Sequence, residues 1–530
     1  MPYRPYYIEQ LTAGLDISLE PRLIQGFSSM LNCRVHKGRL IKRPGYAVRA
    51  TTGQSNPIVG FAKAYRKGPA EILVADTKRL YRLEPVLGTT TELTSGDTFT
   101  GADFQYFQFT SWLNKTYMSN FSDALYVYDG DADTVALVDT GDTTVTRAQH
   151  IFIWKNRLHL INVVIDGNDW KPQRHMWSDV LGGSDPTKVN FSTDNWVDGE
   201  FQGEDDVPML VRFFRGVPYV FFKQFLIPIR SQRVESGSFF WGDPIEQWGS
   251  ITQNFGVRTK NGIMFLNQRN IDLFDGYRGQ AIDLPSMRDF VDTLDNRKWH
   301  YVTGTEAGED DYVYMTYAEN GQSVPNKILE ICTLDNTFST AGIPLNAIYG
   351  FDGFYAPESL IGPNVYDDDY AVDGDFDAST LDLTSEAQLR TTATTFGGDT
   401  AGNILDLNSG TDFGGSTFPV EALSARINPF NKEGLQAVAG RIEFLVTTDA
   451  TASYTLSMYK DQEETTPFKT FTLSCANDST TKVKHWVPKS LDGVRGDTFR
   501  FKLSHTAKDN SPVIHAIRIW LDKGGPIWEK

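Results

Sequence analysis

The sequence lacks the cysteine patterns that mark two common classes of protein. Only three cysteines occur among 530 residues, at positions 33, 332 and 475. They are too few and too far apart for a disulfide framework or a metal cluster of CxxC type. The simplest interpretation is three buried, reduced thiols in a protein that assembles in a reducing cytoplasm.

Export signals and long apolar segments are also missing. Residues 1–15 have neither the apolar core nor the small-residue cleavage site of a signal peptide. The longest apolar run, VPYVFFKQFLIPI at 217–229, is too short to cross a bilayer and is interrupted by Lys223. We therefore expect no membrane-spanning segment and interpret this run as sheet strands.

Motifs of the common enzyme classes are absent as well. The chain has no HExxH, GxSxG, P-loop or GxGxxG sequence in a suitable setting. The eight histidines are dispersed, and we interpret His300 and His485 as core or surface residues. The sequence therefore predicts no catalytic residue, no cofactor and no metal site, and favours a protein that is not an enzyme.

What the sequence does contain is a recurring strand pattern. Helical periodicity is nearly absent, while aromatic residues reach 13% and glycine 45 residues, which suits pleated strands joined by tight turns. Tyr81 and Tyr126 occupy matching places in two such runs, as do Leu226 and Leu273 in two others. A recurrence of about 45 residues is typical of four-stranded blades. We predict a degenerate β-propeller of five to seven blades over residues 51–362.

The composition changes after residue 362. Residues 366–415 are rich in Asp, Thr and Gly, and strand-like runs then resume. Apolar and polar residues alternate strictly over 499–504, as in a half-buried strand. We predict an all-β protein with an N-terminal arm and basic hairpin at 1–50, the propeller at 51–362 and a jelly-roll-like β-sandwich at 363–530.

Several weaker patterns allow a functional and a structural interpretation. Acidic turns at 129–133 and 367–377 space their carboxylates as calcium loops do, but lack the glutamate of an EF-hand. STDNW at 192–196 is interpreted as a turn, and the EDD runs at 204–206 and 309–311 as acidic turns rather than glycosidase acids. Four tryptophans suit a core better than a sugar-binding platform: Trp177, Trp241, Trp248 and Trp299.

The charge is unevenly distributed. The formal net charge is −17, yet residues 1–49 carry eight Lys or Arg against three acidic residues. The run LNCRVHKGRLIKRPGY at 31–46 predicts a β-hairpin that turns at Lys37-Gly38, with one apolar and one basic face. Contact with phosphates, docking on a protein, or an ordinary solvated hairpin would each explain the basic face. The acidic body and the lack of interleaved aromatics favour protein contact. The candidate assembly residues are Arg34, Lys37, Arg39, Lys42, Arg43, Pro44, Gly45 and Tyr46.

The same N-terminal run resembles the opening of the tail-completion proteins of tailed bacteriophages. The resemblance rests on Gly14-Leu15-Asp16, Asn32, Arg34, Gly38, Leu40 and Arg43-Pro44-Gly45-Tyr46. Residues 216–232 and 260–276 are similar to the propeller body of the hub or nozzle proteins of short-tailed phages, and residues 493–522 to the sandwich that follows it. The order of the three regions strengthens the resemblance.

The resemblance implies a structural protein of the virion tail, assembled in the host cytoplasm. Such proteins form rings, of six or possibly twelve copies, that extend the portal and adaptor, retain the genome and attach fibres or a needle. Double-stranded DNA would pass along the ring without sequence-specific contacts, and no catalytic residue carries over. Two alternatives remain: a propeller glycosidase or depolymerase with a carbohydrate-binding module, and a sandwich that binds host glycans.

Overall fold

We describe the protein from a computed structural model. It describes all residues except 1–2, 9, 18–25, 66–69, 85–87, 183–184, 200, 202–205, 232–237, 283–286, 307–310, 355–390, 449–452, 475–482, 507–512 and 528–530. The acidic run 367–377 and most of both EDD runs lie outside the described residues.

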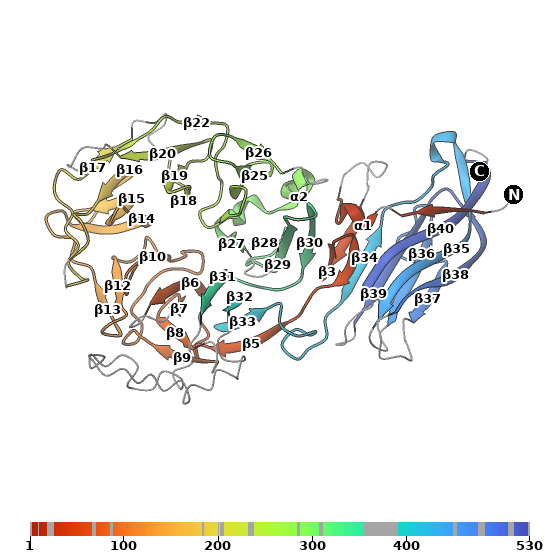
Figure 1. Cartoon of the computed structure of the whole chain (residues 1–530), viewed down its shortest axis with the longest axis horizontal. Helices are drawn as coiled ribbons and strands as arrows, with labels where there is room; N and C mark the ends of the chain where they lie inside the picture. Colours follow the sequence, from red (N-terminus) through yellow and green to blue (C-terminus); the bar gives the residue numbers. More distant parts are fainter. Residues whose placement is uncertain are drawn as a thin grey trace, which may run out of the picture.

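The larger part of the molecule is a β-propeller. Within the described residues, seven sheets of mostly antiparallel meanders follow one another around a common centre (Figure 1). The predicted fold class is therefore confirmed. Tyr81 and Tyr126 both lie in the third strand of their blades, and so do Leu226 and Leu273.

The blades are listed here from the inner strand outward. Blade one is β6 (Ile58–Tyr65), β7 (Ala70–Asp76), β8 (Leu80–Glu84) and β9 (Thr89–Glu92); blade two is β10 (Gln108–Trp112), β11 (Lys115–Ser119), β12 (Tyr126–Asp129) and β13 (Thr134–Leu137). Blade three is β14 (Val145–Trp154), β15 (Arg157–Ile165), β16 (Asp169–Trp177) and β17 (Trp196–Asp198); blade four is β18 (Leu210–Phe214), β19 (Val217–Phe221), β20 (Phe225–Ser231) and β21 (Phe239–Trp241), with β22 (Ile245–Glu246) also pairing β20.

A short helical connection separates blade five from blades six and seven. Blade five is β23 (Gly256–Arg258), β24 (Ile263–Leu266), β25 (Ile271–Phe274) and β26 (Gly279–Ala281), after which come α2 (Met287–Thr293) and the 3₁₀ helix η1 (Asn296–Tyr301). Blade six is β27 (Gly304–Glu306), β28 (Tyr312–Tyr317), β29 (Lys327–Cys332) and β30 (Thr337–Ala341); blade seven is β31 (Ala347–Phe354), β32 (Thr391–Gly398), β33 (Asn403–Leu407) and β5 (Tyr46–Thr51).

Blade seven closes the ring with strands from both ends of the propeller sequence. Its outermost strand, β5, precedes blade one in the chain and pairs with β33 from Tyr46↔Leu407 to Thr51↔Asn403. Backbone hydrogen bonds thereby join the first and last blades. The sandwich does not begin at residue 363 as we predicted, because β32 and β33 complete a propeller blade.

The smaller part is a β-sandwich of two antiparallel sheets. One holds β34 (Val420–Ser424), β39 (Phe499–His505), β36 (Ser453–Lys460) and β37 (Lys469–Ser474); the other holds β40 (Val513–Pro526), β35 (Leu435–Thr448) and β38 (Val483–Gly496). A short 3₁₀ helix, η2 (Asn431–Glu433), precedes β35. The predicted alternation in β39 is present, because Phe499, Phe501 and Leu503 are buried and the residues between them are half-buried.

The N-terminal segment is not a separate arm. It contributes β1 (Arg4–Tyr7), the short helix α1 (Gln10–Ala13), β2 (Phe27–Leu31), β3 (Cys33–His36) and β4 (Arg39–Lys42). Strands β1 and β4 pair with β40 of the sandwich, whereas β2 lies between β30 of blade six and β34. One continuous nine-stranded sheet therefore runs from the propeller into the sandwich. The prediction of an independent region at residues 1–50 is wrong for this reason.

The hydrophobic core is also continuous across this joint. Its largest cluster includes Val313 and Leu329 of blade six together with Phe444 and Phe501 of the sandwich. Smaller clusters fill the spaces between neighbouring blades. Burial of this shared apolar surface stabilises the relative placement of the two parts.

Candidate functional site

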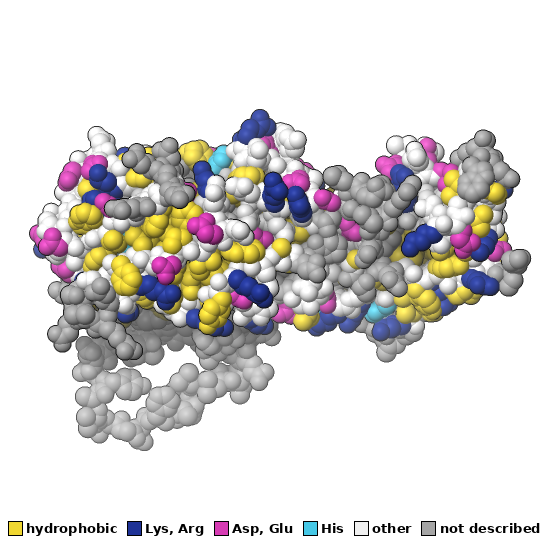
Figure 2. Space-filling view, turned by 90° about the horizontal axis from the view of Figure 1, so that it is seen from above, with side chains coloured by type: hydrophobic (Ala, Val, Ile, Leu, Met, Phe, Trp, Pro, Cys, Tyr) yellow, Lys and Arg dark blue, Asp and Glu magenta, His cyan; other side chains and the backbone are white. Residues whose placement is uncertain are grey.

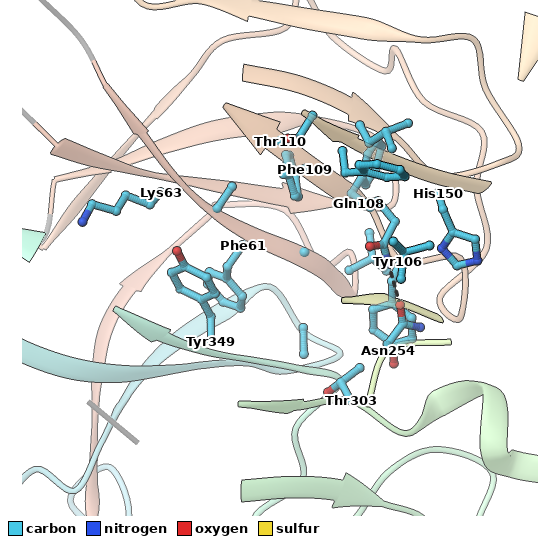
Figure 3. Close-up of a pocket in the computed structure, with 18 of the residues that line it drawn as sticks. Phe61, Lys63, Tyr106, Gln108, Phe109, Thr110, His150, Asn254, Thr303 and Tyr349 are labelled. Atoms are coloured by element: carbon cyan, nitrogen blue, oxygen red, sulfur yellow. Dashed lines mark hydrogen bonds between the residues drawn. The ribbon is translucent and has the colours of Figure 1, made fainter. Parts of the chain in front are cut away.

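The centre of the propeller contains a partly open cavity of about 470 Å³. Each of the seven blades contributes residues to its lining, through the innermost strand or the residues beside it (Figure 3). The amide of Gln108 in blade two donates to Asn254 beside blade five at 2.9 Å. Because these blades are not neighbours in the ring, this bond spans the centre.

The lining is aromatic and carries positive rather than negative side chains. Phe61 and Tyr349 stack with their ring centres 6.3 Å apart. Lys63 and Arg212 are the charged residues among the described lining residues, none of which is Asp or Glu. Desolvation lowers the pKa of Arg212 to about 10, so the guanidinium stays protonated at neutral pH. Burial lowers the pKa of His150 to about 4, which keeps that ring neutral.

The predicted basic hairpin forms as expected but is mostly internal. Strands β3 and β4 pair from Cys33↔Lys42 to His36↔Arg39, and the turn residues Lys37 and Gly38 have φ values of 51° and 68°. Both faces of β3 are packed, one on the sandwich core and one on blade six. The hairpin is therefore part of the joint.

The two arginines at the centre of the prediction cannot serve an external partner. Arg43 has no exposed surface and forms an ion pair with the equally buried Glu330 of β29. Arg34 is 7% exposed, and its guanidinium carbon lies 4.4 Å from the ring centre of Tyr312. The expectation that Arg34 and Arg43 form a docking surface is wrong, since both side chains are buried inside the molecule.

The rest of the RPGY run also makes internal contacts. Lys42 donates to the Thr411 carbonyl at 2.8 Å, and Arg43 Nη1 donates to the Pro44 carbonyl at 2.9 Å. Gly45 is buried where an added Cβ would lie 1.9 Å from the backbone oxygen of Asp412. Tyr46 stacks on Phe413 at 4.8 Å. Lys42, Pro44, Gly45 and Tyr46 thus fix the segment that links propeller and sandwich, while the side chains of Lys37 and Arg39 are exposed.

The other predicted patterns have structural roles wherever their residues are among those described. In the acidic turn 129–133, Asp129 pairs with Lys115 at 3.1 Å and Asp133 with Arg82 at 2.6 Å. The turn at 192–196 bonds to Asp179 through Ser192 and Asn195. The four tryptophans are divided among three hydrophobic clusters, so they form no common platform.

A buried histidine pair between blades three and four was not predicted. His159 Nε2 lies 3.1 Å from the Trp154 carbonyl, so it donates, and His159 Nδ1 then accepts from His175 Nε2 at 2.9 Å. Desolvation lowers the pKa of His159 to about 3 and that of His175 well below its usual value. Both rings are neutral. The two histidines lie 16 residues apart in the sequence, and only the register of the paired strands β15 and β16 shows that they meet.

A cation–π ladder on the outer face of the sandwich was also missed. The Arg518 guanidinium lies 3.9 Å from the ring centre of Trp486, and that of Arg441 lies 4.2 Å from the ring centre of Trp520. Glu443 accepts from the Trp520 indole at 2.9 Å and pairs with both arginines. Because arginine already covers these tryptophans, their faces are not open to a sugar.

One group of potential metal ligands occurs among the described residues. His36, Cys332 and Asp335 each place a ligand atom within 4.8 Å of the others. They come from the hairpin turn and from the β29–β30 turn of blade six.

Comparisons with known proteins identify no family for this chain. No protein-family model and no curated protein matches the chain. Among solved structures, the computationally designed protein Ika8 is 10% identical with a TM-score of 0.36, covering 68% of this chain and 99% of its own. YCF48 bound to D1 peptide is 10% identical with a TM-score of 0.39, covering 69% and 97%. PorZ of the type IX secretion system of Porphyromonas gingivalis is 12% identical with a TM-score of 0.30, covering 55% and 35%.

Within the described part of the chain, no helix combines the length and apolar character needed to cross a membrane.

Proposed function

We propose that this chain is a structural subunit of the tail of a short-tailed bacteriophage, a hub or nozzle protein that forms a ring below the portal and adaptor. The observation that carries the proposal is the role of the RPGY run. The residues on which the phage resemblance rests, among them Asn32, Arg43 and Gly45, build the joint between propeller and sandwich. A motif that fixes two β-domains relative to each other suits a structural subunit, because the role of such a subunit depends on its shape.

In this role DNA passes between subunits and not through the propeller. A cavity of about 470 Å³ holds on the order of 16 waters at ~30 Å³ each. The Gln108–Asn254 hydrogen bond also spans the centre, so a duplex has no free path along it. Several copies must therefore surround the genome. On the face shown in Figure 2, basic and acidic side chains are interspersed, so that face offers no continuous basic track to hold phosphates.

The depolymerase alternative has less support. Hydrolysis of a glycosidic bond usually requires a pair of carboxylates flanking the substrate. The described lining of the propeller cavity contains no Asp or Glu. The four tryptophans considered for a sugar platform are divided among three hydrophobic clusters.

The test is the oligomeric state, measured by mass determination in solution and by negative-stain electron microscopy, alone and with portal and adaptor. We expect rings with an opening of ~20 Å or more, the closed point-group assembly common for homo-oligomers. Arg39→Glu reverses an exposed charge of the hairpin and is expected to weaken ring formation. Lys188→Glu, at a side chain that is 72% exposed on blade three, is the matched control and should leave rings intact.

Charge reversal at Arg43 would not test docking, because that residue is needed inside the joint. Monomers at every concentration, even with portal and adaptor present, would contradict the proposal. If such monomers also released sugar from a polysaccharide, the depolymerase would replace it.

A further inference from the structure

Two turns that are far apart in the sequence meet at the tip of the hairpin. The β3–β4 turn brings His36, and the β29–β30 turn brings Cys332 and Asp335. The backbone N–H of Lys37 donates to the Asp335 carboxylate, which holds the two turns against each other. A nitrogen, a sulfur and an oxygen ligand are thereby gathered within 4.8 Å.

The spacing of these ligand atoms suits a tetrahedral metal ion. Zinc bonds of ~2.3 Å to sulfur and ~2.1 Å to oxygen, at the tetrahedral angle, place those two atoms about 3.6 Å apart. The Cys332 Sγ lies 3.8 Å from Asp335 Oδ2. Small side-chain movements would therefore close the site around an ion, with water in the fourth position.

The surroundings of the ligands fit this chemistry. The Tyr312 hydroxyl lies 3.5 Å from His36 Nδ1 and can orient the ring, as the polar partners of metal-bound histidines do. A coordinating cysteine binds as the thiolate, which the cation itself stabilises. A thiolate and a carboxylate together balance the two positive charges of a divalent ion, so the loaded site is neutral beside Arg34.

We propose that His36, Cys332 and Asp335 form a binding site for a divalent transition metal of the zinc class, which ties the hairpin to blade six. Thiolate and imidazole ligands favour Zn²⁺ or Co²⁺ over Mg²⁺ and Ca²⁺, which prefer oxygen. A metal at this position crosslinks two turns that belong to the sandwich and the propeller. The site is independent of the proposed virion function.

The test uses the full chain after treatment with a chelator, with Co²⁺ as the probe. We expect a thiolate-to-cobalt charge-transfer band and tetrahedral d–d absorption, both lost when Zn²⁺ is added and retained with Mg²⁺. Cys332→Ala should abolish the charge-transfer band, and His36→Gln at a half-buried position should weaken metal binding at least about tenfold. Zn²⁺ should raise the melting temperature of the unsubstituted protein and not that of Cys332→Ala.

The chain offers a matched control in Cys33→Ala. Cys33 is buried three residues from His36, but its Sγ donates to the Glu421 carbonyl at 3.2 Å and belongs to the sandwich side. This variant should bind Co²⁺ with the same band. A spectrum without a charge-transfer band, or a band that persists in Cys332→Ala, overturns the proposal. If Cys332→Ala does not fold, His36→Gln decides: Co²⁺ affinity equal to that of the unsubstituted protein would exclude the site.

Discussion

Two arginine clusters in this molecule use the same chemistry in opposite surroundings. At the joint, Arg43 pairs with Glu330 beside Tyr314, and neither partner of the ion pair has exposed surface. On the outer face of the sandwich, Arg518 pairs with Glu443 beside two tryptophans, and its side chain is 23% exposed. Burial, and not the residue types, decides whether such an arginine–glutamate pair fixes the placement of two parts of the molecule or only covers a surface.

The largest effect is expected from breaking the buried pair. Arg43→Met leaves the Glu330 carboxylate buried without its cation, which should lower the free energy of unfolding by about 3–5 kcal/mol. Urea denaturation, followed separately in the propeller and the sandwich, measures it. We expect the two parts to lose their common transition, because the joint holds them together.

A double variant separates the pair from the packing around it. Arg43→Met with Glu330→Leu removes both charges, and apolar replacements of a buried ion pair are often neutral. It should recover most of the stability that Arg43→Met loses. A double variant as unstable as the single one would show that the guanidinium's own hydrogen bonds, such as that to the Pro44 carbonyl, matter more than the charge.

The next effect concerns the backbone beside the buried arginine. Gly45→Ala places a methyl group where the Asp412 carbonyl already lies, so the linking segment must shift, at about 1–3 kcal/mol. Gly182→Ala is the matched control, because a Cβ there meets no atom within 4 Å. Equal melting temperatures for the two variants would contradict the close approach at Gly45.

A smaller loss is expected on the exposed side of the comparison. Arg518→Met removes the cation from Trp486 and Glu443 but keeps most of the aliphatic stem. Cation–π contacts contribute about 0.5–1 kcal/mol at exposed sites and about 2 kcal/mol where they are desolvated, and Glu443 is only 6% exposed, so we expect a loss of about 1–2 kcal/mol. Thermal unfolding in low and high salt measures it. A loss of stability as large as that of Arg43→Met would mean that this outer face is buried in the functional protein.

The sequence was informative wherever a pattern is local. The repeated tyrosine and leucine positions predicted a recurrence of four-stranded blades, and Lys37-Gly38 predicted the hairpin turn. Alternation over 499–504 predicted the buried face of β39. These features depend on side-chain period and turn chemistry, which neighbouring residues determine.

The sequence could not show which distant segments meet. Strand β5 closes the ring by backbone hydrogen bonds to β33, and such bonds leave no mark in the side chains. The basic hairpin was expected to be exposed because the acid that neutralises Arg43 lies 287 residues away. His36 and Cys332 are separated even more widely, so no spacing motif could reveal the metal ligands.

The smallest expected effect is a pH dependence of the stability that Glu443 contributes on the outer face of the sandwich. Burial opposes the charge on Glu443, but hydrogen bonds from Trp520 and Arg518 prevail and lower its pKa below the usual 4.5. A carboxyl with a lowered pKa adds stability above pH 4.5 that is lost as the pH falls through its folded value. The stability difference between the unsubstituted protein and Glu443→Gln should therefore shrink below pH 4.5. Tryptophan fluorescence during unfolding would follow it, since the Trp520 indole donates to this carboxylate at 2.9 Å. A difference that stays constant from pH 6 to about pH 3 would show that the arginines, and not the charge of Glu443, hold the ladder together.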